Sequence, residues 1–160
     1  MHDITPATPD DLDAIRDLHT ASWADAYARF VPAEALERLD PEMAERWATL
    51  PEGVLCARDG DRLAGFIRLK TRQGWPYIDN LHTRPDLRGQ GIGASLMRAG
   101  FARLRDEGAG RAWLTVIDGN IAARRFYISQ GGHEGARMVE RVLGHPTATR
   151  PVLWLRLPGQ

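Results

Sequence analysis

The sequence Arg88-Gly89-Gln90-Gly91-Ile92-Gly93 is the stretch that decides the fold of this chain. It lies between a strand-like run, Tyr77 to Thr83, and a helix-like run, Ala94 to Arg105. Its glycines let the backbone approach a ligand closely and expose successive N–H groups. The helix that follows adds unsatisfied amides and the positive end of its dipole. The junction is therefore predicted to bind an anion, and a cofactor that contains a pyrophosphate would suit it.

Three glycine-rich phosphate motifs compete for this stretch. A P-loop ends in Gly-Lys-Ser/Thr, but the single lysine of the chain is Lys70, so that motif is excluded. Gly89-x-Gly91-x-x-Ala94 formally matches the dinucleotide fingerprint. That fingerprint requires a tight strand-to-helix turn and an acidic residue about 20 positions on. Here five residues intervene after the strand, and the acidic candidates end a helix, which disfavours a dinucleotide.

The third pattern, Arg88-x-x-Gly91-x-Gly93, resembles the acetyl-CoA signature Gln/Arg-x-x-Gly-x-Gly/Ala of the GNAT superfamily of N-acetyltransferases. Downstream, Asn120-x-x-Ala123-x-x-Phe126-Tyr127-x-x-x-Gly131 is similar to the second GNAT signature, Asn-x-x-Ala-x-x-hydrophobe-Tyr-x-x-x-Gly-Phe. The two signatures occur in the right order, with one helix and one strand between them. One position departs: Gly132 stands where the signature has Phe, which predicts looser packing at the end of that helix.

The resemblance covers most of the chain, from about Ile4 to the last strand. Before the glycine loop, the pattern His19-x-x-Ser22-Trp23-x-x-x-Tyr27 with a later Val31-Pro32 and Trp47 is similar to a bacterial GNAT subgroup whose acceptors are often unknown. The resemblance implies an acetyl-CoA-dependent N-acetyltransferase, with acetyl-CoA as co-substrate and a primary amine of a small molecule or peptide as acceptor. A noncatalytic acyl-CoA-binding sensor with the same fold is the alternative.

Composition limits the remaining possibilities. The 160 residues fit one domain that covers the whole chain, 1–160, and can bury a core without disulfides. With 21 basic and 21 acidic residues, no global field recruits nucleic acid or an anionic membrane. The single cysteine, Cys56, suits a reducing cytoplasm, and the sequence shows neither a signal peptide nor a membrane span. We expect a cytoplasmic protein and assign no metal ligands; the sequence leaves monomer and homodimer open.

Periodicity and turn signals predict a mixed α/β fold in three layers. The resemblance implies a GNAT-like central sheet, mostly antiparallel and flanked by helices, in the order βααβββαβαββ. The expected strands are Asp3 to Ala7, Val54 to Arg58, Leu63 to Lys70, Trp75 to Thr83, Ala112 to Ile117, Glu134 to Val142 and Val152 to Leu157. The expected helices are Leu12 to Tyr27, Pro32 to Leu50 with a break at Pro41, Gly91 to Glu107 and Asn120 to Gln130.

The strand before the glycine loop carries an irregular spacing. Ile78 and Leu81 are both apolar but three residues apart, so facing both inward requires a bulge near Asp79-Asn80. A regular strand buried on both faces is the competing interpretation. The resemblance places thioester-facing amides and pantetheine pairing here. The implied cofactor contacts are Leu81, His82, Thr83, Arg88, Gly89, Gln90, Gly91, Ile92, Gly93, Ala94, Ser95, Asn120 and Tyr127.

The matched signatures also supply candidate catalytic residues. Tyr127 is the implied general acid for the departing thiolate. Asn120, seven residues earlier, shares its helix face and positions the cofactor or a water, although it also suits a helix cap. For the base, Asp79 ranks before His82, whose ordinary pKa is suitable. Cys56 lies on an internal strand, so we expect direct attack in a ternary complex instead of a covalent route.

The acceptor pocket is expected in the helical segments before the first hairpin. Trp23, Tyr27 and Phe30 offer apolar walls, and Glu34 is a candidate anchor for a cationic amine. Packing of these aromatic residues onto the sheet is the competing interpretation. Further candidates for the site or its surroundings are Trp47, Trp75, Tyr77, Arg124, Arg125, His145 and Pro146.

Overall fold

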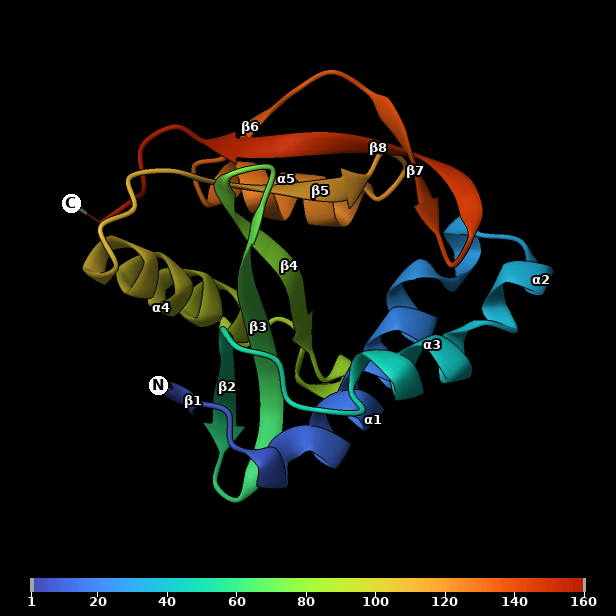
Figure 1. The fold of residues 1–160 in the computed structure, drawn as a ribbon, viewed down its shortest axis with the longest axis horizontal. Helices are drawn as coiled ribbons and strands as arrows, with labels where there is room; N and C mark the ends of the chain where they lie inside the picture. The colour runs from blue at the N-terminus through green and yellow to red at the C-terminus, as the bar shows by residue number, and fades with distance from the viewer. Residues whose placement is uncertain (1, 160) are drawn as a thin grey trace.

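The structure is a computed structural model, and it describes residues 2–159 (Figure 1). The N-terminal part contains β1 (Asp3–Pro6), the 3-10 turn η1 (Pro9–Asp11), α1 (Leu12–Tyr27), η2 (Ala28–Phe30), α2 (Ala33–Leu36) and α3 (Leu39–Arg46). The central part contains β2 (Val54–Asp59), β3 (Arg62–Arg72), β4 (Trp75–Thr83), η3 (Pro85–Leu87) and α4 (Ile92–Asp106). The C-terminal part contains β5 (Ala112–Ile117), α5 (Ile121–Ser129), β6 (His133–Glu134), β7 (Met138–Val142) and β8 (His145–Trp154). Within residues 2–159, no helix is both long enough and apolar enough to cross a membrane.

The strands form one sheet in the order β1-β2-β3-β4-β5-β8-β6, and β7 pairs with β8. All neighbours are antiparallel except β4 and β5, which run parallel and pair at Tyr77 and Trp113 alone among their described residues. The predicted mixed, mostly antiparallel sheet is confirmed. Beyond that one pair β4 and β5 diverge (Figure 1), and the divergence opens the middle of the sheet.

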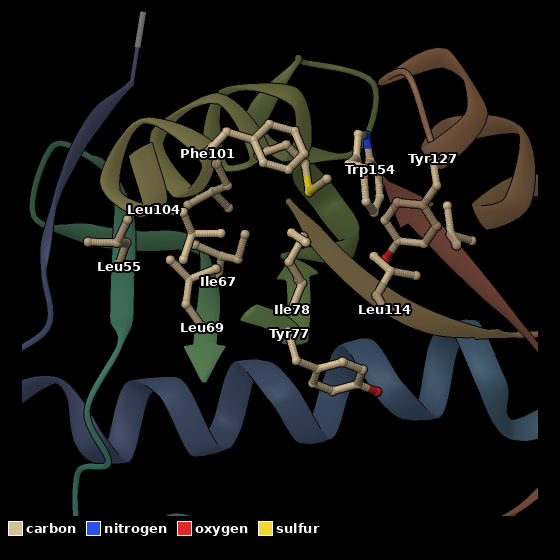
Figure 2. Close-up of a cluster of buried hydrophobic side chains, with 14 of the residues drawn as sticks. Leu55, Ile67, Leu69, Tyr77, Ile78, Phe101, Leu104, Leu114, Tyr127 and Trp154 are labelled. Carbon is tan, nitrogen blue, oxygen red and sulfur yellow. The ribbon is translucent and has the colours of Figure 1, made fainter. Parts of the chain in front are cut away.

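Side chains of the central strands alternate between two hydrophobic cores. On β3, Ile67 belongs to the core beneath α4, whereas its neighbour Phe66 belongs to the core beneath α1. Figure 2 shows the first core, where Phe101 and Leu104 descend from α4 onto the strands, and α1 passes on the opposite side. Each large apolar side chain buried in this way contributes about 1.5–3 kcal/mol. Helices cover both faces of the sheet, so the expected three layers are present.

Helix α1 follows the predicted pattern from its first residue. Before it, the backbone N–H of Thr8 donates to Asp11 Oδ2 at 2.8 Å, and the two residues form a capping box. The buried residues of α1 recur at spacings of three and four, which places them on one face. They are Ile15, Leu18, His19, Ser22 and Trp23. The sequence interval Leu12 to Tyr27 is confirmed, and its inner face carries two polar side chains toward the sheet.

The helical region after α1 differs from the prediction at its break. The break was expected at Pro41, but Pro41 lies in the first turn of α3, and the interruption follows Leu36. A proline is tolerated in a first turn because the N–H that it lacks would have no helical partner there. Helix α3 ends at Arg46, not at Leu50, and Trp47 is 1% exposed in the core beneath α1.

The last strands also differ from the prediction. The interval Glu134 to Val142 is divided into β6 and β7, and the final strand is His145–Trp154 instead of Val152 to Leu157. Strands β7 and β8 form a hairpin whose turn residues, Leu143 and Gly144, both have positive φ. Two prolines within β8 obscure it in the sequence, because proline has no N–H to donate to a ladder. Residues 2–159 therefore form one α-helix and one strand more than βααβββαβαββ.

The end of α5 is tightly packed, which corrects the expected looseness at Gly132. A Cβ added at Gly132 would lie 2.5 Å from Val152 Cγ1 and 2.9 Å from Trp154 Cζ2, so this position has no room for a side chain. Trp154 is fully buried there, and its Nε1 donates to the carbonyl of Gln130 at 3.0 Å. An aromatic ring thus packs against this helix end, but it comes from β8 and not from the residue after Gly131.

Candidate active site

Strand β4 carries the predicted bulge. Two consecutive residues of β3 pair with Asn80 and with Ile78, so Asp79 is the extra residue on β4. Because of this insertion, both Ile78 and Leu81 contact the core beneath α4 despite their spacing of three. The bulge also brings Asp79, Asn80 and Leu81 to the walls of a cavity. The regular strand considered for this interval is therefore excluded.

A cavity of about 660 Å³, here called the cofactor cavity, lies between β4, the glycine loop with the start of α4, and α5. Most of the residues predicted to contact the cofactor line it. These are Leu81, His82, Thr83, Arg88, Gly89, Gly91, Ile92, Gly93, Ala94, Asn120 and Tyr127. Ser22, Asp25 and Arg29 complete the side formed by α1 and η2, and Arg88 forms an ion pair with Asp25. The glycine loop and the second signature thus face one space.

The glycine loop has the geometry that a pyrophosphate requires. Gly89 and Gly91 have φ of 81° and 78°, a region that favours glycine, and a Cβ at either position would meet nothing within 4 Å. Gly91 is the N-cap of α4, and no side chain caps this helix. The first amides of a helix have no intrahelical acceptor, so the uncapped start of α4 presents donors to an anion. These residues fit acetyl-CoA, whose phosphates would lie against them.

Helix α5 carries both residues of the second signature. Asn120 is its N-cap, and the Asn120 Oδ1 atom accepts a hydrogen bond from the N–H of Ala123 at 3.2 Å. The capping role considered for Asn120 is confirmed, and the residue also lines the cofactor cavity. Two turns later Tyr127 points into the molecule beside Trp154 and Leu114 (Figure 2).

The side chain of Tyr127 is positioned and kept protonated by its surroundings. Its ring is perpendicular to that of Trp154, with centroids 6.3 Å apart, and the residue is 9% exposed. Burial raises the pKa of Tyr127 well above its ordinary value, and the neighbouring Tyr27 and Tyr77 raise it further. A tyrosine in this state carries its proton throughout the physiological pH range and can donate it.

A second cavity, of about 540 Å³, adjoins the first and is here called the acceptor cavity. Its walls come from α1, α3, the diverging strands β4 and β5, and the β7–β8 hairpin. The lining combines apolar and charged side chains. The apolar group includes Trp23, Met43, Ile78, Leu114, Val142 and Leu143, and the charged group consists of Glu42, Arg46, Arg72, Asp79, Glu140 and Arg141. This composition suits a polar ligand with a small apolar part.

The two cavities share four residues: Tyr27, Leu81, His82 and Tyr127. Two of these belong to β4 just after its bulge, one ends α1, and one belongs to α5. A ligand in the cofactor cavity and a ligand in the acceptor cavity would therefore meet at the Tyr127 side chain. The divergence of β4 and β5 makes this junction possible, because paired strands would close the sheet at this position.

The carboxylate of Asp79 is surrounded by cations. Its Oδ2 accepts hydrogen bonds from Arg68 Nη1 at 3.0 Å, from Arg46 Nη1 at 3.4 Å and from Asn80 Nδ2 at 3.1 Å. The Nζ atom of Lys70 lies 3.8 Å from Oδ1. The side chain of Asp79 is 13% exposed, so these partners surround most of it. Its position on the bulge is as predicted, but its lone pairs are largely engaged by cations and an amide.

Two buried histidines lie in contact at the junction. The ring centroids of His19 and His82 are 4.3 Å apart; Trp47 Nε1 donates to His19 Nδ1 at 2.9 Å, and Ser22 Oγ is hydrogen-bonded to His82 Nδ1 at 3.0 Å. Burial, together with the positive charges of Arg46 and Arg88, lowers the pKa of His82 to about 3. Burial also lowers the pKa of His19, with added effects from His82 and Arg46. Both rings are neutral at physiological pH.

Several predicted residues lie outside the two cavities. On the cofactor side, Gln90 and Ser95 do not line the space; Ser95 Oγ instead accepts from Arg98 at 3.1 Å. Arg124 forms ion pairs with Glu134 and Asp118 instead of facing phosphates.

On the acceptor side, Trp23 and Tyr27 line the cavity, but Phe30 and Glu34 do not. The Phe30 ring is half-buried under the Arg29 guanidinium, and Glu34 is exposed on α2. The expectation that Glu34 anchors the acceptor is therefore not supported by its position. Trp47 is buried in the core, and the Trp75 ring lies against the Arg111 guanidinium. His145 and Pro146 are the first residues of β8 and do not line the acceptor cavity. Of the two aromatic residues predicted from the sheet, Tyr77 lines the acceptor cavity and Trp75 does not.

The sequence interpretation missed several residues of the acceptor cavity, among them four charged ones. Arg46 comes from α3, Arg72 from the end of β3, and Glu140 and Arg141 from β7. Arg72 Nη2 donates to Glu140 at 2.8 Å, and Arg72 Nη1 donates to the Tyr77 hydroxyl at 3.0 Å. Arginine and glutamate are common on helix and strand surfaces, so no local signal distinguishes these four from solvated residues.

Comparison with known proteins also identifies the family to which this chain belongs. Residues 12–131 match the family described as "Acetyltransferase (GNAT) family". An uncharacterized N-acetyltransferase of Mycobacterium bovis is 34% identical over 122 residues, which cover 74% of this chain and 70% of that protein. A mycothiol acetyltransferase of Streptomyces bingchenggensis is 33% identical over 100 residues; the match covers 60% of this chain but only 32% of that longer protein.

Solved structures show the same fold. A GCN5-related N-acetyltransferase from Rhodopseudomonas palustris superposes with a TM-score of 0.78 at 22% identity, covering 96% of this chain and 94% of that one. The PaiA N-acetyltransferase of Thermoplasma acidophilum, solved in complex with coenzyme A, gives a TM-score of 0.68 at 21% identity and covers 94% and 98% of the two chains. The glycine loop at an uncapped helix start, the bulged strand and the match over residues 12–131 place this chain in the GNAT family of acetyltransferases, with acetyl-CoA as its co-substrate.

Proposed function

We propose that this protein transfers an acetyl group from acetyl-CoA to a primary amine by direct attack within a ternary complex. The observation that carries the proposal is the meeting of two cavities at Tyr27, Leu81, His82 and Tyr127. Acetyl-CoA supplies the activated acyl group as a thioester. The cofactor cavity would hold the phosphates at the glycine loop, and the acceptor cavity would bring the amine to the same four residues from the other side.

Tyr127 serves as the general acid in this proposal. The leaving thiolate must gain a proton, and Tyr127 carries one at physiological pH, since its pKa is raised above an ordinary value that is already high. Two observations support this role: the second signature predicts Tyr127, and its side chain lines both cavities. Proton donation from a positioned side chain typically contributes 10²–10⁴-fold to the rate, roughly the range expected for Tyr127.

His82 is the better candidate for receiving the amine proton. It lines both cavities, whereas Asp79, which ranked first on sequence grounds, lines only the acceptor cavity, and its Oδ2 atom accepts hydrogen bonds from two arginines and Asn80. Burial is the main cause that lowers the pKa of His82 to about 3, and the positive charges of Arg46 and Arg88 contribute to that value. Phosphates bound beside Arg88 would offset its charge and raise the pKa of His82, so the histidine becomes a stronger base when the cofactor is bound.

A covalent route through the cysteine has no support from the structure. Cys56 is fully buried, lines neither cavity, and burial raises the pKa of its thiol to about 12. A thiol in that state is a poor nucleophile. A noncatalytic sensor of acyl-CoA is the alternative function, but it would require only the cofactor cavity. The second cavity, which opens onto Tyr127, favours the enzyme.

The Tyr127→Phe variant tests the proposed function. It keeps the ring against Trp154 and removes only the hydroxyl, so the fold and acetyl-CoA affinity should be retained. With a panel of polyamines, amino acids, aminoglycosides and peptides, turnover measured by CoA-thiol release should fall by roughly 10²–10⁴-fold. Tyr77→Phe is the matched control, because Tyr77 lines only the acceptor cavity and bonds to Arg72 and Thr115.

Two results would contradict the proposal. Full activity of Tyr127→Phe with an unchanged pH profile would remove Tyr127 from the mechanism. Binding of acetyl-CoA by the wild type, measured by calorimetry, without acetylation of any amine in the panel would favour the sensor. For the base, His82→Gln should lower turnover by roughly 10²-fold without raising the KM for acetyl-CoA. If Asp79→Asn instead gave that signature and His82→Gln did not, the roles would be reversed.

A further inference from the structure

The charges that line the acceptor cavity are unequally neutralised. Glu140 accepts a hydrogen bond from Arg72 at 2.8 Å, so this pair is matched within the wall. Asp79 is bound by Arg68 and Lys70, neither of which lines the cavity. Two carboxylates of the wall are therefore already engaged before the remaining arginines are considered.

Arg46 and Arg141 are the cations that remain. Arg141 donates to the backbone carbonyl of Gly144 at 2.9 Å and forms no ion pair among residues 2–159. Arg46 reaches Asp79 at 3.4 Å, as the third cation on one carboxylate. The remaining acid of the wall, Glu42, lies one turn before Arg46 on α3 but forms no ion pair with it in the described part of the chain. The three acids and three arginines of the wall balance, but Arg68 and Lys70 behind it add positive charge around Asp79, so Arg46 is not needed to neutralise that carboxylate.

The Arg46 guanidinium is placed to meet a ligand. Its side chain is 32% exposed, and its Nη2 atom makes no hydrogen bond to any described residue. It lies close enough to the two histidines for its charge to lower their pKa values. Arg46 lines the acceptor cavity together with Asp79 and His82, so its guanidinium keeps a hydrogen-bond donor for a ligand in that space. A planar guanidinium with a free edge matches a carboxylate in shape and charge.

We propose that the acceptor amine also carries a carboxylate, and that Arg46 binds this carboxylate in the acceptor cavity. This inference rests on the proposed acetyl transfer and adds the chemical class of the acceptor. A single negative charge fits better than a dianion, because Glu42 and Asp79 face the same space. The amine of such an acceptor lies at the junction of Tyr127 and His82, and its acid group lies toward α3.

The carboxylate has a second effect on the site. When it binds, it offsets the charge of Arg46, and phosphates offset that of Arg88. These are the two charges that lower the pKa of His82 in addition to burial. Both ligands of the ternary complex therefore make His82 a stronger proton acceptor, whereas either alone leaves one of the two charges in place.

Matched pairs of acceptors test the inference. Glycine, 3-aminopropanoate, 4-aminobutanoate and phenylalanine are each compared with their primary carboxamides, and kcat/KM is measured by CoA-thiol release. At least one acid should exceed its amide by roughly 10–100-fold, the range expected for a charge-assisted pair. In Arg46→Gln that ratio should fall to roughly threefold or less, while the KM for acetyl-CoA changes little. Arg46→Lys should restore part of it.

Arg16→Gln is the matched control, because Arg16 pairs with Asp13 on the exposed side of α1 and lines neither cavity. It removes the same charge and should leave the acid-to-amide ratio unchanged. Amides that react as well as their acids in every pair would overturn the inference and leave acetyl transfer intact. If no pair reacts, the binding of 3-phenylpropanoate and of its amide to the CoA-bound protein is measured by calorimetry. Binding that favours the acid and depends on Arg46 supports the inference. Equal binding of acid and amide, or no binding of either, contradicts it. Acetyl-CoA binding without transfer to any amine contradicts the proposed function instead.

Discussion

The cofactor cavity and the acceptor cavity meet at Tyr127 but are built in different ways. The cofactor cavity takes much of its wall from one short stretch, residues 81–94, where glycines expose the backbone at the start of α4. The acceptor cavity draws its charged side chains from α3, from strands β3 and β4, and from the β7–β8 hairpin. A site made of backbone needs glycines at fixed spacing, whereas a side-chain site can use any positions that tertiary contacts bring together.

This difference predicts separable effects of mutation. Changes at the glycine loop should alter acetyl-CoA affinity alone, and changes in the acceptor wall should alter the acceptor KM alone. Of the four shared residues, Tyr127 and His82 should affect the chemical step, whereas Tyr27 should affect acceptor binding. Three experiments beyond those above can confirm or break this separation.

The largest separable effect is expected at Gly91. In Gly91→Val the side chain enters the cofactor cavity and disturbs the amides of α4, so the Kd for acetyl-CoA should rise by roughly 10–100-fold. Gly74→Val is the matched control: Gly74 also has positive φ (80°) and an open Cβ direction, but it lies in the β3–β4 turn outside both cavities. Both variants carry similar backbone strain. Calorimetry should show weaker binding in Gly91→Val only; equal binding by both would break the comparison.

A smaller effect is expected on the acceptor side. Tyr27→Phe removes one hydroxyl from the cavity junction and should raise the acceptor KM by roughly 3–10-fold, the effect of one neutral hydrogen bond. Glu34→Gln should leave it unchanged, because Glu34 is exposed on α2 and lines neither cavity. Steady-state kinetics with varied acceptor at saturating acetyl-CoA measures both. A raised KM in Glu34→Gln with a normal Tyr27→Phe would move the acceptor site onto α2.

A third effect concerns stability instead of ligand binding, and it arises at the two buried histidines that line the acceptor cavity. Burial lowers the pKa of His82 to about 3 and also lowers that of His19, whereas an unfolded histidine titrates near its ordinary value of 6.5. Below that value the unfolded chain binds protons that the folded chain excludes. The free energy of unfolding should therefore be constant above about pH 6.5 and fall below it, by up to about 1.4 kcal/mol per pH unit for each histidine.

Urea denaturation between about pH 5 and pH 7 measures this slope. His82→Gln should reduce it, and His133→Gln should not, because His133 is exposed. A wild-type protein whose stability does not change over that interval would show that the two histidines bind protons in the folded state as well. The carboxyls of Asp11 and Asp86, whose pKa values are lowered mainly by hydrogen bonds from arginine, add their loss of stability only at lower pH.

Some tertiary features followed from local signals. The spacing of Ile78 and Leu81 predicted the bulge at Asp79. In a regular strand, side chains three residues apart point to opposite faces of the sheet, so both can face one core only if a residue is inserted between them. The seven-residue spacing of Asn120 and Tyr127 predicted that their side chains share one face of α5, and both residues line the cofactor cavity. In each case the decisive residues lie within a few positions of one another.

Other features had no local signal. The sequence shows an aspartate on a bulge, but the contacts of Asp79 with Arg46 and Arg68 depend on how α3 and β3 meet β4. Gly132 suggested a loose helix end, but Trp154, 22 residues later, fills that space from β8. Prolines concealed β8, and with it the hairpin that supplies Glu140 and Arg141 to the acceptor wall.

By itself, the sequence determined the family, and it predicted the cofactor site and Tyr127 as the acid, because backbone conformation and helix periodicity are set by neighbouring residues. The tertiary structure alone decided the acceptor cavity, the engagement of Asp79 by cations and the unbonded Nη2 atom of Arg46. The physical reason is that the charge balance around a side chain depends on every element that packs against it. The elements around this cavity extend from α1 to the β7–β8 hairpin, so their side chains become neighbours only when the sheet has formed and β4 and β5 have diverged.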